Sequence, residues 1–235
     1  DKDVIRAYRE RTGDTFGGIC CLPLTVRSFG DVYHGRGKLF HSTGTTGEPV
    51  YFVYTKDDVD MACDLEARGW WRMGLRPNDV MLGGWGGMNL LDWHFEAVNH
   101  ENTTVRLFNF YLICNAIDPT QDFRVATQLE SQGIHIKRVY TAIPAFRWLL
   151  QKMEQEGKNL KRDYFPQLKS LLQTGELSQS LLDYGCQLFG APLCSLSAVT
   201  ESLWTGKSGC FYAWEEGEGA RTSLHVPEDS HFVEV

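Results

Sequence analysis

The alternation of short apolar segments with amphipathic segments most constrains the fold of this chain. Apolar runs of strand length recur along the sequence, and segments with helical periodicity of about ten to fifteen residues separate them. The expected strands are Val50–Tyr54, Val80–Leu82, Arg106–Cys114, Ile136–Tyr140 and Leu168–Leu172. The expected helices are Asp3–Thr12, Leu90–His100, Phe123–Gln132, Ala145–Glu156 and Ser178–Phe189, the last closed by Gly190. A further helix starts at Thr55–Asp58 and is stopped by Gly74. This order predicts an α/β fold of alternating βαβ units with a mainly parallel sheet.

Ligands of such sheets bind beyond the carboxyl ends of the strands. Segments rich in small or polar residues follow the expected strands at four places. They are Gly83–Gly87, Thr141–Pro144, Thr174–Glu176 and Ser197–Glu201. The sequence therefore predicts that the functional residues of the chain lie in these segments.

A further segment, His41–Pro49, combines hydroxyl side chains with glycines. Glycine lets a backbone approach a ligand closely, and exposed N–H groups with small hydroxyls suit phosphate oxygens. The segment is not a Walker A loop, because Glu48 and Pro49 follow its second glycine instead of Lys and a hydroxyl residue. It indicates an anion-binding loop, with a plain surface turn as the alternative interpretation.

Charge and cysteine content exclude several classes of function. A net charge of −7 argues against nucleic acid and anionic membranes as partners, and no apolar run approaches the length of a membrane helix. The 7 cysteines are odd in number and show no C-x-x-C pair. A disulfide framework is therefore not expected, and a reducing, cytoplasmic location fits.

Several ordered motifs resemble the adenylate-forming acyl- and aryl-CoA ligases, particularly the phenylacetate-CoA ligase group. The S-T-G-T-T-G-E-P loop is followed by a strand and by Y-T-K-D-D, and a G-L-R-P-N-D turn comes next. The further landmarks, in family order around these, are Leu22–Thr25, Thr141–Phe146, Thr174–Glu176, Val199–Glu201 and His225–Asp229. The resemblance implies an irregular lead-in over residues 1–40 and an AMP-binding core domain over residues 41–235, with the C-terminal lid domain beyond the printed sequence.

The resemblance also implies a reaction and a set of site residues. A carboxylic acid would be activated by ATP to an acyl-adenylate and transferred to coenzyme A. The ATP-binding residues would be Ser42, Thr43, Gly44, Thr45, Thr46 and Gly47 at the phosphates and Gly175 and Glu176 at adenine. Thr200 would contact the α-phosphate and Glu201 would bind Mg²⁺, which prefers carboxylate oxygen. Trp85, Gly86, Gly87 and Thr141 would line the acid pocket, although an aromatic core plug is an equal interpretation of Trp85.

Departures from the family pattern favour a second hypothesis. Ser197 and Ala198 replace the expected Tyr-Gly pair, and Glu48 replaces a lysine near the phosphates. The ribose-binding aspartate and the catalytic lysine of the family would follow the last printed residue. The alternative is a degenerate homologue that binds a nucleotide, an acyl ligand or a partner protein without catalysis.

Other partners complete the set of expectations. A carrier-protein thiol is the alternative acceptor to coenzyme A, and the chain is compatible with a homodimer. Cys210 and His225 are candidate zinc ligands, since thiolate and imidazole suit that metal. Their spacing matches no zinc-finger pattern, so a buried thiol and a surface histidine are the alternative interpretation.

Overall fold

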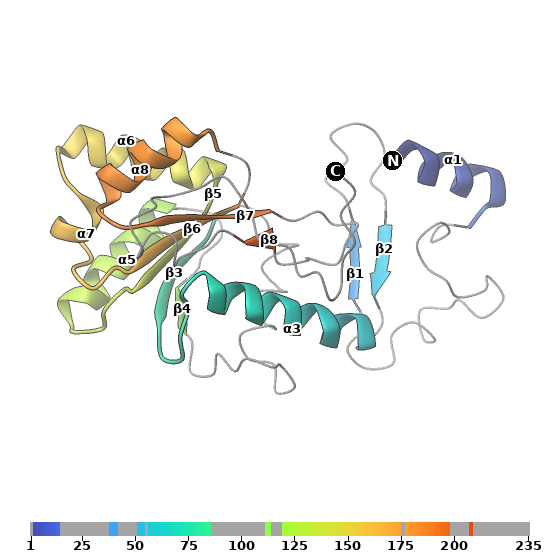
Figure 1. Cartoon of the computed structure of the whole chain (residues 1–235), viewed down its shortest axis with the longest axis horizontal. Coiled ribbons are helices and arrows are strands. Elements are labelled where there is room, and N and C mark those ends of the chain that lie inside the picture. Colours follow the sequence, from blue (N-terminus) through green and yellow to red (C-terminus); the bar gives the residue numbers. More distant parts are fainter. Residues whose placement is uncertain are drawn as a thin grey trace. The chain divides into compact units, whose positions relative to one another are not determined.

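A computed structural model of the chain describes residues 2–14, 38–41, 51–54, 56–85, 111–113, 119–174, 177–197 and 207–208 (Figure 1). These residues belong to two compact units, which divide between Ala62 and Cys63. The division falls inside helix α3 (Lys56–Arg72).

Among its described residues, the first unit contains helix α1 (Lys2–Thr12), a pair of short strands and the first part of α3. Helix α1 confirms the helix expected from Asp3. Strands β1 (Lys38–His41) and β2 (Tyr51–Tyr54) pair antiparallel, with His41 opposite Tyr51. His41 and Tyr51, which flank segment 42–50 with the predicted phosphate-binding residues, are therefore direct neighbours across the strand pair.

Helix α3 confirms the predicted helix between β2 and the first strand of the large sheet. Asp57 and Asp58 lie in its first turn, where negative charge interacts favourably with the helix dipole. Ala62, Cys63, Ala67 and Trp70 recur along the helix at helical spacing and are buried. Gly74 ends the helix in the left-handed conformation (φ 89°), and the Leu75 N–H donates back to the Trp70 carbonyl oxygen at 3.0 Å.

The second unit is built on a six-stranded sheet with the order β4-β3-β5-β6-β7-β8. Strands β4, β3, β5, β6 and β7 run parallel, and β8 pairs antiparallel with β7. Their bounds are β3 Val80–Trp85, β4 Tyr111–Ile113, β5 Arg138–Ala142, β6 Ser170–Thr174, β7 Leu193–Ser197 and β8 Lys207–Ser208. The predicted α/β fold with a mainly parallel sheet is confirmed.

Helices α5 (Pro119–Ser131), α6 (Ile143–Glu156) and α8 (Gln179–Phe189) cover one face of this sheet, and a short helix α7 (Leu160–Asp163) follows α6 (Figure 1). The three long helices confirm their predicted positions to within a few residues. Their apolar sides meet the sheet in one core, which includes Leu82, Phe123, Val139, Phe146, Leu149, Leu171, Phe189 and Leu193. The Trp70 and Tyr140 rings lie 5.9 Å apart. Tyr140 neighbours the core residue Val139 along β5, so α3 contacts the opposite face of the sheet.

Three strands are longer at their carboxyl ends than the sequence predicts. The sequence predicts that β3 stops at Leu82 and that glycines follow it, but the strand continues to Trp85. Strand β5 continues past Tyr140 to Ala142, and β6 continues past Leu172 to Thr174. The cause is tertiary, because pairing with the adjacent strands extends all three segments beyond their apolar cores.

A buried ion pair joins the amino ends of three strands. The Arg138 side chain at the start of β5 is 1% exposed, and its Nε donates to Asp79 Oδ2 at 3.0 Å. Its two remaining nitrogens donate to Ser170 Oγ at 2.7 Å and to the Gly74 carbonyl oxygen. Burial lowers the pKa of the Arg138 guanidinium from its ordinary value, and Asp79 opposes that shift. One side chain thus connects the α3–β3 turn to β5 and β6.

Replacing Arg138 with methionine should destabilise the protein by about 3–5 kcal/mol, because Asp79 would remain buried without its main cation. Urea unfolding measures this change. The control is Arg162→Met, which breaks the exposed pair of Arg162 with Asp163 and should have little effect. Equal losses in the two variants would contradict the role of burial.

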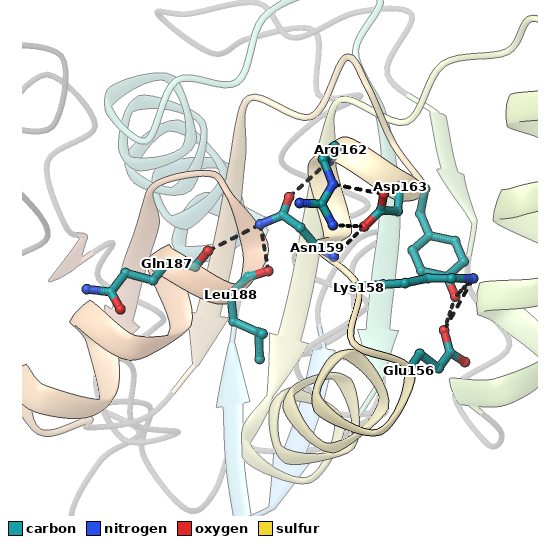
Figure 2. Close-up of polar contacts among 8 residues, drawn as sticks. Glu156, Lys158, Asn159, Arg162, Asp163, Gln187 and Leu188 are labelled. Carbon is teal, nitrogen blue, oxygen red and sulfur yellow. Dashed lines mark hydrogen bonds and ion pairs between the residues drawn. The ribbon is translucent and has the colours of Figure 1, made fainter.

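Asn159 connects the end of α8 to the start of α7 (Figure 2). Its Oδ1 accepts from the Arg162 backbone N–H at 2.9 Å, which caps α7. Its Nδ2 donates to the carbonyl oxygens of Gln187 and Leu188 at 3.2 and 2.9 Å, so it also satisfies the last turn of α8. A Cβ at Gly190, which follows α8 with φ 68°, would lie 2.6 Å from Asn159 Oδ1. The connection therefore depends on glycine at position 190.

Gly190→Ala should destabilise the protein more than Gly157→Ala does. Both glycines end a helix in the left-handed conformation, with φ 68° and 61°, but a Cβ at Gly157 would meet nothing within 4 Å. Gly157→Ala should therefore cost only the backbone term of about 1–2 kcal/mol. The difference between the two alanine variants should shrink in an Asn159→Ala background, and an unchanged difference by urea unfolding would show that Asn159 is not the obstacle.

Candidate functional site

The carboxyl ends of β3, β5, β6 and β7 form one edge of the parallel sheet. Ala142 at the end of β5 is opposite Thr174 at the end of β6, and Thr174 is opposite Leu196 in β7. Three of the segments predicted to carry function therefore begin at neighbouring strand ends. This is the edge at which parallel α/β sheets bind their ligands.

One step inside this edge, four residues are aligned across the strands. Trp85 of β3 is opposite Thr141 of β5, Thr141 is opposite Gln173 of β6, and Gln173 is opposite Ser195 of β7. We call this set the edge row. Trp85 and Thr141, which the family resemblance assigned to the acid pocket, are thus direct cross-strand neighbours although they are far apart in the chain.

Thr141 is fully buried in this arrangement. Its Oγ1 lies 3.5 Å from the carbonyl oxygen of Leu172 in β6, at the long limit of a hydrogen bond. The side chain therefore packs between strands at the base of the edge. Its assignment to the acid pocket stays a prediction.

Gln173 is a member of the edge row that sequence reasoning missed. Its side chain is fully buried, whereas Leu171, on the same face of β6, belongs to the apolar core. The signal that could have indicated Gln173 is a polar residue at an inward position of a strand. Such a residue is unusual, because burying an amide is costly unless it is hydrogen-bonded. The predicted strand Leu168–Leu172 ends one residue before Gln173, so the sequence did not place Gln173 in the sheet.

Most other predicted site residues lie outside the described residues. They are Ser42, Thr43, Gly44, Thr45, Thr46, Gly47, Gly86, Gly87, Gly175, Glu176, Thr200, Glu201, Cys210 and His225. In the sequence, Gly86 follows Trp85, the last residue of β3, and Gly175 follows Thr174, the last residue of β6. The roles of all these residues stay predictions.

The buried thiols near the sheet are not suited to nucleophilic chemistry. Cys63, Cys186 and Cys194 are all buried. Burial raises the pKa of the Cys186 thiol to about 11, and the Leu193 backbone N–H only partly offsets this shift. Cys186 is therefore protonated at neutral pH.

Metal-binding clusters and membrane-spanning helices are both absent from the described ranges. Those residues contain no group of three or more His, Cys, Asp or Glu side chains arranged to hold a metal ion. Cys210 and His225 are not among them, and no observation supports the zinc hypothesis. In the same part of the chain, no helix combines the length and apolarity that a membrane crossing requires.

The Thr141 side chain should contribute to stability through its methyl group more than through its hydroxyl. Thr141→Ser removes a buried methyl and should cost about 1 kcal/mol. Thr141→Val keeps the shape and loses only the 3.5 Å contact, so it should cost less. Thermal unfolding of the two variants tests this order, and a larger loss in the valine variant would contradict it.

Comparison with known proteins identifies the fold. No protein-family model matches the sequence, and no curated protein matches it. Among solved structures, the open conformation of 2-hydroxyisobutyryl-CoA ligase in complex with 2-HIB-AMP and CoA has a TM-score of 0.64 at 18% identity and covers 89% of this chain and 42% of its own.

Two further structures agree. The N-terminal domain of FACL13 from Mycobacterium tuberculosis gives a TM-score of 0.56 at 15% identity, covering 83% of this chain and 46% of its own. O-succinylbenzoate coenzyme A synthetase from Bacillus subtilis, in complex with ATP and magnesium ion, gives a TM-score of 0.53 at 15% identity. This match covers 83% of the present chain and 38% of the synthetase chain. The chain thus has the fold of the N-terminal part of acyl-CoA ligases of the adenylate-forming type, and it spans less than half the length of these structures.

Proposed function

We propose that this chain is the N-terminal core of an AMP-forming acid–thiol ligase. The observation that carries the proposal is the convergence at one edge of the sheet. Trp85 is opposite Thr141, and Ala142 is opposite Thr174, which directly precedes Gly175. The segments that the motifs assign to the acid and to adenine therefore start side by side, on a fold shared with acyl-CoA ligases.

The proposed reaction has two steps. A carboxylate oxygen of the acid attacks the α-phosphorus of ATP, and pyrophosphate leaves. A thiol then attacks the acyl carbon, loses its proton and displaces AMP. The first step requires charge neutralisation at the phosphates and in-line alignment of the attacking and leaving oxygens.

Each proposed residue meets one of these requirements. Ser42, Thr43, Thr45 and Thr46, with the N–H groups around Gly44 and Gly47, would bind the β- and γ-phosphates. Thr200 would donate to the α-phosphate, and Gly175 and Glu176 would border adenine. Glu201 would hold Mg²⁺, which neutralises phosphate charge. Trp85, Gly86 and Gly87 would form the wall of the acid pocket.

The solved structures on the same fold support the choice of ligands. The Bacillus subtilis synthetase was determined with ATP and magnesium ion, and 2-hydroxyisobutyryl-CoA ligase with an acyl-AMP and CoA. We extend these ligands to this chain, with an aryl or acyl acid as the substrate and coenzyme A as the thiol. The cytoplasm supplies both ATP and coenzyme A, and is the proposed location.

The proposal is tested by acid-dependent exchange of labelled pyrophosphate into ATP, with the full-length protein and a broad panel of carboxylic acids. Exchange with at least one acid is expected. Glu201→Gln should reduce the exchange rate by about a hundredfold, because a charged metal ligand becomes neutral. Arg162→Met, on an exposed pair remote in sequence from every proposed site segment, is the control and should exchange like the wild type.

A non-catalytic homologue is the second candidate, favoured by Ser197 and Ala198 at the expected Tyr-Gly pair and by Glu48 in the phosphate loop. Titration calorimetry with ATP and AMP separates the two functions. Binding without exchange for any acid would reject the ligase and support the homologue. If exchange occurs, offering coenzyme A and a carrier protein in parallel identifies the acceptor thiol.

A further inference from the structure

The close approach of β3 to β5 at Gly83 is the most restrictive feature of the candidate edge. A Cβ placed on Gly83 would lie 2.3 Å from the Tyr140 carbonyl oxygen and 2.7 Å from the Tyr140 Cβ. Both distances are below any that real Cβ atoms adopt, and the nearest obstacle is backbone, which cannot rotate away. Gly83 also has φ 156°, outside the range that L side chains normally adopt. Position 83 therefore accepts only glycine in this arrangement.

The same position begins an irregularity in the strand. Gly83 is opposite Tyr140, but the next matched pair is Trp85 with Thr141, so Gly84 is an extra residue on β3. This is a β-bulge, and glycine within a strand commonly marks either a bulge or a close backbone approach. Here both occur together.

The bulge decides which residue of β3 is opposite Thr141. In a regular strand, Gly84 would be opposite Thr141, and Trp85 would be opposite Ala142. The shift brings Trp85 into the edge row instead. The bulge therefore changes the backbone register of β3 against β5 by one residue at position 85.

We propose that Gly83 is a positioning residue that selects the acid substrate, because the bulge it permits places Trp85 beside Thr141 in the wall of the acid pocket. The inference rests on the proposed function, which supplies the acid pocket. Gly83 does not touch the substrate and acts through the register of Trp85. A side chain at position 83 would push β3 away from Tyr140. The close approach of β3 to β5, which accompanies the bulge, would then be lost.

The test compares Gly83→Ala with Gly133→Ala in the full-length protein. Gly133 also has a positive φ, 85°, but a Cβ there would meet nothing within 4 Å, so it controls for the backbone cost of replacing glycine. KM for the acid and KM for ATP are measured separately by pyrophosphate exchange, together with the ratio of kcat/KM for a narrow and a wide acid.

Gly83→Ala should raise KM for the acid at least about tenfold and change the ratio between the two acids, because a small displacement of a pocket wall misplaces the substrate. KM for ATP should stay within about twofold, since ATP would bind chiefly outside β3. Gly133→Ala should leave all of these values near those of the wild type. An unchanged acid KM in Gly83→Ala, an equal rise for ATP, or the same effect in Gly133→Ala would overturn the inference.

Trp85→Ala provides a second test that keeps Gly83, and it decides the question if Gly83→Ala does not fold. It should also change the acid KM and the ratio between the two acids while leaving KM for ATP within about twofold, and an unchanged acid KM would overturn the inference. If the wild type exchanges pyrophosphate but the variants keep the wild-type KM for the acid, only the role of Gly83 is rejected. Absence of exchange in the wild type with every acid rejects the proposed function itself and, with it, this role.

Discussion

The Arg138 guanidinium is the interaction on which the arrangement of the sheet most depends. It connects the turn before β3 to β5 and β6 through Asp79, Ser170 and the Gly74 carbonyl oxygen. A buried arginine is tolerated only when its donors are satisfied, so these partners must remain in place together. Because the pair sits where the strands begin, it fixes their relative start, and the parallel register carries this alignment to their carboxyl ends.

At those carboxyl ends the strands present a site with one irregularity. The edge row crosses β3, β5, β6 and β7 in regular register, except where Gly84 is inserted. The amino ends are held by charge and hydrogen bonds, whereas the carboxyl end of β3 depends on the absence of a side chain at Gly83. A ligase of this kind would thus combine a fixed scaffold with a pocket wall whose position one glycine controls.

Much of the fold was predictable because the helices and strands are locally coded. Residue type predicts helix ends at Gly74 and Gly190, and both glycines adopt the left-handed conformation. The carboxyl ends of β3, β5 and β6 were not predictable. Gly83 and Ala142 have weak strand signals by themselves, and the pairing of these strands with their neighbours extends the sheet beyond the apolar segments. Short α7 was missed because a four-residue helix has no periodicity to detect.

The sequence by itself determined the α/β class, the order of its helices and strands, and the motifs that resemble the adenylate-forming ligases, since all of these are written in residue type and short-range spacing. Only the tertiary structure decided that Trp85 is opposite Thr141, that Gln173 lies between Thr141 and Ser195, and that Gly83 cannot carry a side chain. The physical reason is that register and close approach depend on the neighbouring strand, and the residues of that neighbour are distant in the chain.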